Sequence, residues 1–288
     1  MPFCSSSSVV NLARRSSSST SNARISGAIG PGYPWSCRTG ASVTLGHTPV
    51  RSRSRSACTV AVMAVIELRG ASRVYPTPQG TFTALVGVDL SLAAGELIAV
   101  VGKSGSGKST LVNLVAGIDR PTAGTVRVAG TSLTELPESK LSSWRGRHVG
   151  VVFQFFQLLP TLTILENVML PIDLCGTLTT PKARERARAL LDRVGIADQA
   201  NKLPTALSGG QQQRAAIARA LANDPPVVLA DEPTGNLDST TADAILELLR
   251  ELARSGKTVV TVTHERDIAA HADRVITLVD GRVEVAHE

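Results

Sequence analysis

The chain has 288 residues and a formal net charge of +6, with 43% hydrophobic and 19% charged residues. It has no uninterrupted apolar run of the roughly 20 residues that a membrane-spanning helix needs, so we do not expect the chain itself to form a transport channel. Three of its four cysteines precede residue 60 and only Cys175 follows. This spacing gives no disulfide framework and no zinc site, and it fits a reducing compartment.

The first 62 residues differ in composition from the rest. Residues 1–66 contain seven arginines, serine runs and no Asp, Glu or Lys, which leaves 23 basic and 24 acidic residues elsewhere. Such a segment cannot bury enough apolar surface to fold, so we expect a disordered Ser/Arg-rich tail over 1–62 and a folded domain over 63–288. Three origins of the tail stay open: an organelle transit peptide, a native disordered extension, or residues upstream of a true start at Met63. Because the basic pI belongs to the tail, it does not indicate a nucleic-acid partner, and we expect none.

The first motif of the folded part is a phosphate-binding loop at residues 102–109. Its sequence, GKSGSGKS, matches G-x-x-x-x-G-K-[ST] in full. The apolar run 97–101 predicts a buried strand before the loop, and 110–115 predicts a helix after it. Backbone N–H groups and the helix N-terminus would bind phosphate oxygens, Lys108 would reach the β- and γ-phosphates, and the Ser109 hydroxyl would hold Mg²⁺. The residues expected to contact the nucleotide are Gly102, Ser104, Gly105, Ser106, Gly107, Lys108, Ser109 and Thr110.

An acidic pair follows a second buried strand, which the sequence predicts over 226–230. At the tip of a strand beside the phosphate loop, Asp231 would help to hold Mg²⁺. Glu232 would then orient or deprotonate the attacking water. The alternative is a strand that ends in two solvated acids, which is common in proteins but less fitting beside a phosphate loop.

A second helix N-terminus suited to anions opens at Ser208. This serine is a good N-cap, and Gly209, Gly210 and Gln211 follow it at the start of an alanine-rich helix that runs to Leu221. The two glycines leave the N-terminal amides accessible to phosphate. Two phosphate-binding helix ends in one chain suggest ATP held between two subunits, although an ordinary capped helix has the same sequence features.

These motifs together resemble the ATP-binding cassette (ABC) ATPase family, whose signature motif resembles LSGGQQQR at 207–214. The resemblance implies that Tyr75 stacks on adenine and that Asp238, in a D-loop, contacts nucleotide. It also implies that Gln154 serves catalysis and Mg²⁺ binding, and that His264 grips the γ-phosphate as a catalytic residue. The alternatives are a plain strand tyrosine, a solvated loop glutamine and a helix-capping histidine.

The resemblance covers residues from about 65 to 285 and implies an α/β P-loop fold. We expect a mostly parallel core sheet flanked by helices, an N-terminal antiparallel β subdomain, and a helical lobe at about 157–207 that carries the signature motif. Strand–helix alternation, with further strands predicted over 258–263 and 274–279, supports the parallel sheet.

The segments ADEPTGNLD at 230–238 and LLPTLT at 158–163 resemble one branch of the family. That branch contains ATPases of lipoprotein release, macrolide export, antimicrobial-peptide resistance and cell division. It implies a homodimer that binds ATP and Mg²⁺ and closes to power a membrane permease, peripherally at the cytoplasmic face of the inner or plasma membrane. Organelle targeting applies if the tail is a transit peptide. The alternative is a cell-division type ATPase that signals to an envelope partner with low turnover.

Two other ABC classes fit less well. ABC ATPases of DNA repair carry a long coiled coil between loop and signature, and translation-type proteins carry two cassettes. Three of the five phenylalanines lie next to Gln154: Phe153 precedes it, and Phe155 and Phe156 follow it. We expect them to form a partly exposed apolar patch that receives a short helix of the permease.

Overall fold

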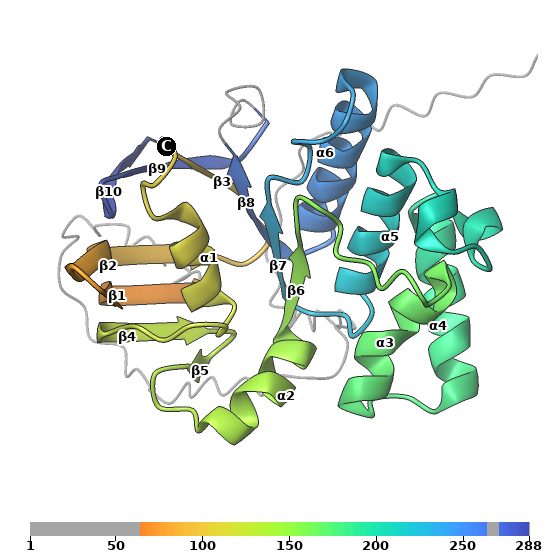
Figure 1. The fold of residues 1–288 in the computed structure, drawn as a ribbon, viewed down its shortest axis with the longest axis horizontal. Helices are drawn as coiled ribbons and strands as arrows, with labels where there is room; N and C mark the ends of the chain where they lie inside the picture. The colour runs from red at the N-terminus through yellow and green to blue at the C-terminus, as the bar shows by residue number, and fades with distance from the viewer. Residues whose placement is uncertain (1–63, 264–270, 288) are drawn as a thin grey trace, which may run out of the picture. The chain divides into compact units, whose positions relative to one another are not determined.

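The computed structural model describes residues 64–263 and 271–287, and every element named here belongs to them. A six-stranded sheet has the order β10-β9-β3-β8-β7-β6 (Figure 1). All neighbours in it are parallel except the pair β9 and β10. Its strands are β3 (Leu97–Val101), β6 (Val149–Val152), β7 (Val227–Asp231), β8 (Thr258–Thr263), β9 (Arg274–Val279) and β10 (Arg282–His287). The predicted parallel sheet is therefore confirmed.

The central strands are rich in Val, Leu and Ala, with buried threonines in β8, because both faces of the sheet are covered. Val227 and Leu229 of β7 pack into one hydrophobic cluster, whereas Val228 and Ala230 pack into another on the opposite face. This alternation follows from the two-residue period of a strand. Each fully buried Val or Leu contributes about 1.5–3 kcal/mol, so the two clusters hold the sheet rigid under the loops at its edge.

A second, antiparallel sheet has the order β2-β1-β4-β5. It consists of β1 (Ala64–Thr77), β2 (Gly80–Ala93), β4 (Ala123–Val128) and the short β5 (Thr131–Ser132). Helix α1 (Lys108–Val115) lies between the two sheets (Figure 1), and its Leu111 and Leu114 share a core cluster with Leu68 of β1. The helix that follows the phosphate loop thus anchors the loop to both sheets.

The remaining helices are α2 (Glu138–His148), α3 (Ile164–Cys175), α4 (Thr180–Arg193), α5 (Gly209–Ala220) and α6 (Ser239–Arg254). Short 3-10 helices, η1 (Ala197–Gln199) and η2 (Pro204–Ala206), connect α4 to α5. Helices α3, α4 and α5 pack together at one side of the larger sheet (Figure 1). Across the described residues, no helix combines the length and the apolar character that crossing a membrane requires.

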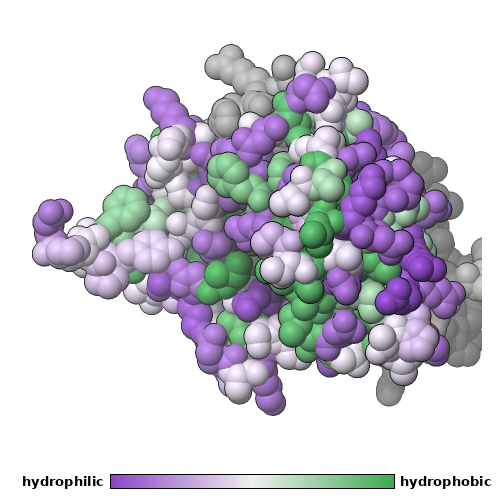
Figure 2. Space-filling view, turned by 45° about the vertical axis from the view of Figure 1, so that its right-hand side comes forward, coloured by the Kyte–Doolittle hydropathy of each residue, from purple (hydrophilic) through white to green (hydrophobic). Residues whose placement is uncertain are grey.

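Figure 2 brings the helical side of the protein forward and shows hydrophobic residues gathered among hydrophilic ones on that face. Phe155 is 71% exposed and Leu174 is 78% exposed, and Leu159 is also exposed. Phe153 and Phe156 are half-buried. The expected patch after Gln154 is therefore open at Phe155, whereas Phe156 lies partly inside the protein.

The parallel strand order brings distant motifs to one edge. The loop after β3, the acidic pair at the end of β7 and Gln154 after β6 all follow carboxyl ends of parallel strands. Because β8 lies between β3 and β7, and β6 pairs with β7, these ends are neighbours at the same edge of the sheet. Ligands of open α/β sheets bind at this edge.

Candidate nucleotide site

The phosphate loop takes a shape that only glycine permits at two positions. Gly105 and Gly107 have φ values of 80° and 102°. A Cβ at Gly107 would lie 2.5 Å from the carbonyl oxygen of Ala84, and one at Gly102 would lie 2.3 Å from that of Leu278. The glycines of the motif therefore let the loop wrap closely against β2 and β9.

Lys108 is 8% exposed and begins α1. Its Nζ donates hydrogen bonds to the carbonyl oxygens of Gly102, at 2.8 Å, and Lys103, at 2.9 Å. The ammonium is thus held inside the curl of the loop, where β- and γ-phosphates are bound in P-loop proteins. Ser106 is 5% exposed, and its Oγ has no hydrogen-bond partner. A buried hydroxyl without a partner is unusual in a rigid loop, and a phosphate oxygen would satisfy it.

The acidic pair stands at the end of β7. Asp231 is the last residue of the strand and is half-buried, and burial together with the neighbouring carboxylate of Glu232 raises the pKa of Asp231 above its ordinary value, while Lys108 opposes the shift. Glu232 has a φ of 46°, a left-handed conformation that costs energy for a residue with a side chain. Its N–H donates to the carbonyl of Val262 at 2.9 Å, which fixes the turn. Strained backbone of this kind concentrates at functional sites.

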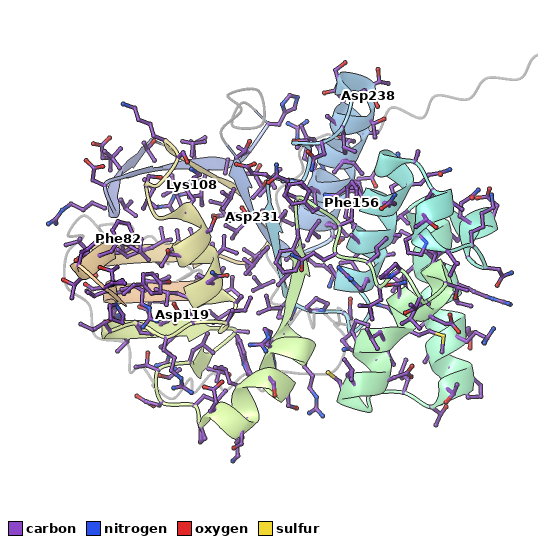
Figure 3. The ribbon with its side chains drawn as sticks, viewed as in Figure 1. Phe82, Lys108, Asp119, Phe156, Asp231 and Asp238 are labelled. Atoms are coloured by element: carbon purple, nitrogen blue, oxygen red, sulfur yellow. The ribbon has the colours of Figure 1, made fainter. Side chains whose placement is uncertain are left out.

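A cavity of about 480 Å³ lies between the loop and the acidic pair (Figure 3). Most of its lining was predicted: the loop residues Ser104, Gly105, Gly107, Lys108, Ser109 and Thr110, and the acids Asp231 and Glu232. Phe82, Ala84 and Val262 complete it. Phe82 was not predicted from the sequence, although an aromatic residue in a polar hairpin tip, PTPQGTFT, was an available signal. Phe82 is 53% exposed, so its ring is open to a ligand in the cavity.

Tyr75, the residue expected to stack on adenine, is already engaged by protein groups. Its hydroxyl donates to Oδ2 of Asp119 at 2.7 Å, and Cζ of Arg73 lies 4.5 Å from its ring centroid. Arg73 also forms an ion pair with Asp119 at 2.8 Å. Tyr75 lies directly opposite Phe82 in the β1–β2 pairing, but it is not among the residues that line the cavity.

Gln154 lies at the end of the β6 strand next to the acidic edge, where its side chain approaches Gly235. A Cβ at Gly235 would lie 3.1 Å from Nε2 of Gln154. The carbonyl of Gln154 accepts a hydrogen bond from Nδ2 of Asn236 at 3.1 Å. The loop at 154–157 and the loop at 235–238 are therefore in contact. His264, the expected γ-phosphate contact, lies outside the described residues.

Helix α5 begins within the signature motif and is capped by Ser208, as the sequence predicts. The Ser208 hydroxyl accepts from the Gln211 N–H, and the Gln211 side chain accepts from the Ser208 N–H, which forms a capping box. Asp238 caps α6 in a similar way, since its carboxylate accepts hydrogen bonds from the N–H and hydroxyl of Thr241. Neither Asp238 nor any residue of 208–211 is among those that line the cavity at Lys108, and Figure 3 places Asp238 and Lys108 well apart. One chain therefore does not bring the two helix ends that we expect to bind anions to the same cavity.

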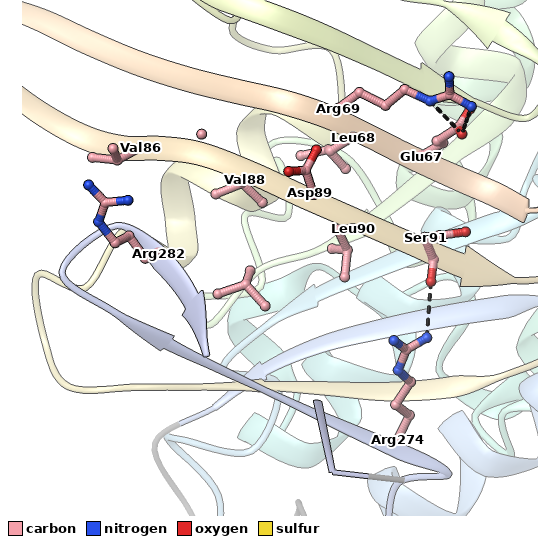
Figure 4. Close-up of a pocket in the computed structure, with 12 residues that line it drawn as sticks. Glu67, Leu68, Arg69, Val86, Val88, Asp89, Leu90, Ser91, Arg274 and Arg282 are labelled. Carbon is pink, nitrogen blue, oxygen red and sulfur yellow. Dashed lines mark hydrogen bonds and ion pairs between the residues drawn. The ribbon is translucent and has the colours of Figure 1, made fainter. Parts of the chain in front are cut away.

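Two other cavities carry different chemistry. One of about 630 Å³ lies where β1 and β2 face β9 and β10 (Figure 4), lined by Arg69, Asp89 and Arg274 among others, and it contains none of the motif residues. Arg274 there donates to the carbonyl of Ser91 at 3.0 Å. Another, of about 460 Å³, lies between α2 and α3 and is lined in part by Leu170 and Leu174. The site that matches the predicted chemistry is the one at the phosphate loop.

The donors near the phosphate loop suit a hard cation. Ser109 offers a hydroxyl and Asp231 a carboxylate at the cavity, and Gln154 offers an amide oxygen from the adjoining loop. Mg²⁺ prefers oxygen ligands and takes few of them from the protein, while water and phosphate oxygens supply the remaining positions. The three residues therefore fit the predicted Mg²⁺ role.

Comparison with known proteins shows the family to which the chain belongs. Residues 85–235 match the family model described as ABC transporter. The chain is 49% identical to the lipoprotein-releasing system ATP-binding protein LolD of Chromohalobacter salexigens over 76% of its own length and 92% of that protein. It is also 49% identical to the macrolide export ATP-binding/permease protein MacB of Rhodopseudomonas palustris, over 76% of the chain but only 33% of MacB. The chain thus spans about a third of its MacB relatives.

Solved structures agree in fold. The dimeric post-hydrolysis structure of the ATP-binding cassette MJ0796, bound to ADP and phosphate, has a TM-score of 0.72 and 42% identity, and it covers 77% of this chain and 98% of the other. This likeness confirms the predicted P-loop fold, with a mixed core sheet, an antiparallel β subdomain and flanking helices. The chain therefore belongs to the ABC transporter family and is an ABC ATPase of the branch that contains LolD and MacB.

Proposed function

We propose that the protein is the ATP-hydrolysing subunit of an export complex, in which two copies close on ATP and transmit the motion to a membrane permease. The observation that carries this proposal is the separation of two phosphate-binding elements. The cavity at Lys108 contains the loop and the acids but nothing from Ser208–Gln211. If the signature end is to reach a nucleotide, a second copy must supply it.

In the proposed mechanism the phosphates of ATP accept hydrogen bonds from donors that are bonded within the loop when no nucleotide is present. Lys108 turns from the carbonyls of Gly102 and Lys103 to the β- and γ-phosphates. The orphan hydroxyl of Ser106 gains an acceptor. Ser109, Asp231 and Gln154 would hold Mg²⁺, whose charge would offset that of the phosphates.

Glu232 acts as the general base in this proposal. It stands next to Asp231 and lines the cavity, where it could contact an attacking water. The expected roles of His264 and Asp238 belong to the same closed state, in which the second copy completes the site. Turnover then reopens the pair, because the bridging γ-phosphate is lost.

The permease is proposed from the relatives. LolD is named for a lipoprotein-releasing system, and MacB is named as an ATP-binding and permease protein in one chain. We propose a separate permease here, with lipoprotein, lipid, drug or peptide as cargo, or mechanical work without passage of cargo. The cassette would then sit peripherally at the cytoplasmic face of the inner or plasma membrane. The second candidate, a cell-division type ATPase with low turnover, rests on the same motifs.

The test uses Glu232→Gln. This variant should keep ATP binding, because the phosphate loop is untouched, and lose about 10²- to 10⁴-fold in steady-state hydrolysis, the scale for removal of a general base. Gel filtration with ATP and Mg²⁺ should then show a dimer that ADP does not support. Hydrolysis at the wild-type rate would remove Glu232 from the mechanism. A monomer in ATP, with binding intact, would disprove closure of two copies. ATPase activity with and without the co-purified permease separates the export role from low-turnover signalling.

A further inference from the structure

Arg219 joins the signature helix to the loop that follows Gln154. It lies in the last turn of α5, and its guanidinium donates to two successive backbone carbonyls of that loop. Nη2 is 2.8 Å from the oxygen of Phe156, and Nη1 is 2.5 Å from the oxygen of Gln157. The contact spans more than 60 residues of sequence, so it connects two separate motifs of one chain.

The two residues that Arg219 holds are in an unfavourable conformation. Phe156 and Gln157 have φ values of 56° and 50°, so two successive residues with side chains are left-handed. Crowding between the Cβ and the backbone disfavours this conformation for every residue except glycine. It persists only where neighbouring groups determine it, and the planar fork of an arginine can hold two carbonyls at fixed positions.

The guanidinium of Arg219 is partly shielded from water where it binds the two carbonyls. Arg219 is half-buried, and desolvation lowers the pKa of its guanidinium from the ordinary value. A buried charge is costly unless hydrogen bonds compensate it, and the two carbonyls supply them. An exposed arginine would not constrain the loop in this way.

The same helix contacts the catalytic loops at its other end. A Cβ at Gly209 would lie 3.7 Å from Cζ of the Phe156 ring and 3.9 Å from the carbonyl oxygen of Asn236. Asn236 in turn donates to the carbonyl of Gln154. Midway along the helix, the buried Gln213 donates to the carbonyl of Pro233 at 2.6 Å, next to Glu232. Helix α5 is therefore tied at several points to the loops of its own nucleotide site.

We propose that Arg219 is a positioning residue that makes the loop at 154–157 move as one unit with α5. The inference rests on the proposed pairing of two copies, in which Ser208–Gly210 serves the partner's nucleotide. Movement of Gln154 at one nucleotide then carries the signature end toward the other. Arg219 would couple the two ATP sites without touching either nucleotide.

The experiment compares Arg219→Met, which keeps length but loses the hydrogen bonds, with Arg219→Lys, which keeps the charge. The matched control is Arg254→Met, because Arg254 lies in the last turn of α6 and is 67% exposed. In the full chain, Arg219→Met should lower kcat about tenfold or more while the Kd for ATP changes less than about twofold, since Arg219 touches no nucleotide and its loss affects the coupling of the loop to α5. The kcat of Arg219→Lys should lie between the values of the wild type and Arg219→Met. The kcat of Arg254→Met should match that of the wild type.

A rescue variant separates positioning from mere stability. Glycine adopts a positive φ without strain, so Gln157→Gly should restore part of the lost kcat in the Arg219→Met background. In the Glu232→Gln background, Arg219→Met should raise the ATP concentration for half-maximal dimer formation at least about fivefold.

The outcomes distinguish the two proposals. A kcat for Arg219→Met within twofold of the wild type would overturn the role of Arg219. So would a parallel loss of kcat and Tm that neither Arg219→Lys nor Gln157→Gly relieves. If Arg219→Met fails to fold, Arg219→Lys with and without Gln157→Gly gives the same comparison. Absence of an ATP-dependent dimer in Glu232→Gln alone would instead overturn the pairing of copies, while the kcat series still decides the role of Arg219.

Discussion

Tyr75 and Phe82 are direct partners across the β1–β2 hairpin, and of the two it is Phe82 that lines the cavity around the phosphate loop. Residues opposite each other in an antiparallel pair project to the same face, so both rings lie on one side of the sheet. Arg73 covers one face of the Tyr75 ring, and Asp119 binds its hydroxyl. The base of a bound nucleotide would therefore meet Phe82 as well as any free surface of Tyr75.

We expect Phe82→Ala to weaken ATP binding about fivefold to thirtyfold, because stacking of a base on an aromatic ring is worth about 1–2 kcal/mol. The affinity for inorganic tripolyphosphate, which lacks a base, should not change. Phe82→Tyr, which keeps an aromatic ring, is the matched control. Calorimetric titration of both ligands measures these differences. Equal ATP affinities for Phe82→Ala and the wild type would leave base binding to Tyr75, whose adenine role stays a prediction.

The raised pKa of Asp231 predicts how nucleotide-free stability depends on pH. Because burial and Glu232 raise its pKa in the folded state, the folded protein binds the proton more tightly than the unfolded chain does. That contribution to stability is present below the ordinary carboxyl pKa and is lost as pH rises through the raised value. Asp231→Asn should therefore increase the Tm of the nucleotide-free protein at pH 7 to 8, and the gain should shrink as the pH is lowered toward about 4.

Asp238 supplies a control, because its pKa is shifted in the direction opposite to that of Asp231. Hydrogen bonds from the side chain and backbone of Thr241 lower the pKa of Asp238. Its contribution is present above the ordinary carboxyl pKa and disappears as pH falls through the lowered value. Asp238→Asn should thus lower the Tm at neutral pH and lose its effect in acid. Melting curves of the two variants that shift in the same direction would show that the environment of Asp231 is not the cause.

Much of the site was predictable because its residues belong to short continuous segments of the sequence. The loop at 102–109 and the acids after β7 follow apolar strand runs, and parallel pairing places such strand ends at one edge. The strand predictions for β3, β8 and β9 are confirmed at the residues expected, and that for β7 is displaced by one residue. The signature helix is confirmed with its capping box, because a Ser followed three residues later by Gln is a local signal.

Contacts between distant segments were not predictable in the same way. Phe82 joins the cavity only because the β1–β2 hairpin folds over the phosphate loop. Phe156 was expected in a partly exposed patch and is half-buried, but its contact with Gly209 after the left-handed turn at Phe156 and Gln157 was not predicted. No periodicity encodes such a turn, since its hydrogen bonds come partly from local backbone groups and partly from Arg219, 63 residues away from Phe156.

Asn167 should be a large contributor to the stability of the helical lobe. It is fully buried, and its side chain accepts from the N–H of Leu159 and donates to the carbonyls of Leu159, Leu162 and Thr163. Asn167→Ala should lower the free energy of unfolding by about 2–4 kcal/mol, because buried backbone groups lose their partners. Asn201→Ala, at an exposed asparagine nearby, should change it by less than about 0.5 kcal/mol. Urea denaturation measures both, and equal effects would contradict a specific role of Asn167.

Phe155 is the residue we expect to anchor the permease. Its ring is 71% exposed directly after Gln154, and Leu159 nearby is also exposed. An aromatic side chain left in water by the isolated subunit is typical of an interface anchor, and a short amphipathic helix of the permease would cover it. Phe155→Ala should therefore reduce co-purification with the permease at least about tenfold, the effect of losing roughly 1.4 kcal/mol or more, while ATP affinity and Tm of the isolated subunit stay unchanged.

Phe156→Ala provides the contrast, because Phe156 is half-buried and its ring lies 3.7 Å from the position of a Cβ at Gly209. Its truncation should lower the Tm and hydrolysis of the isolated subunit, since the loop after Gln154 loses packing against α5. Assembly with the permease, measured at a temperature where the variant is folded, should fall less than for Phe155→Ala. Normal complex assembly by Phe155→Ala would show that the permease docks elsewhere, for which the cavity between α2 and α3, lined by Leu170 and Leu174, is the next surface to test.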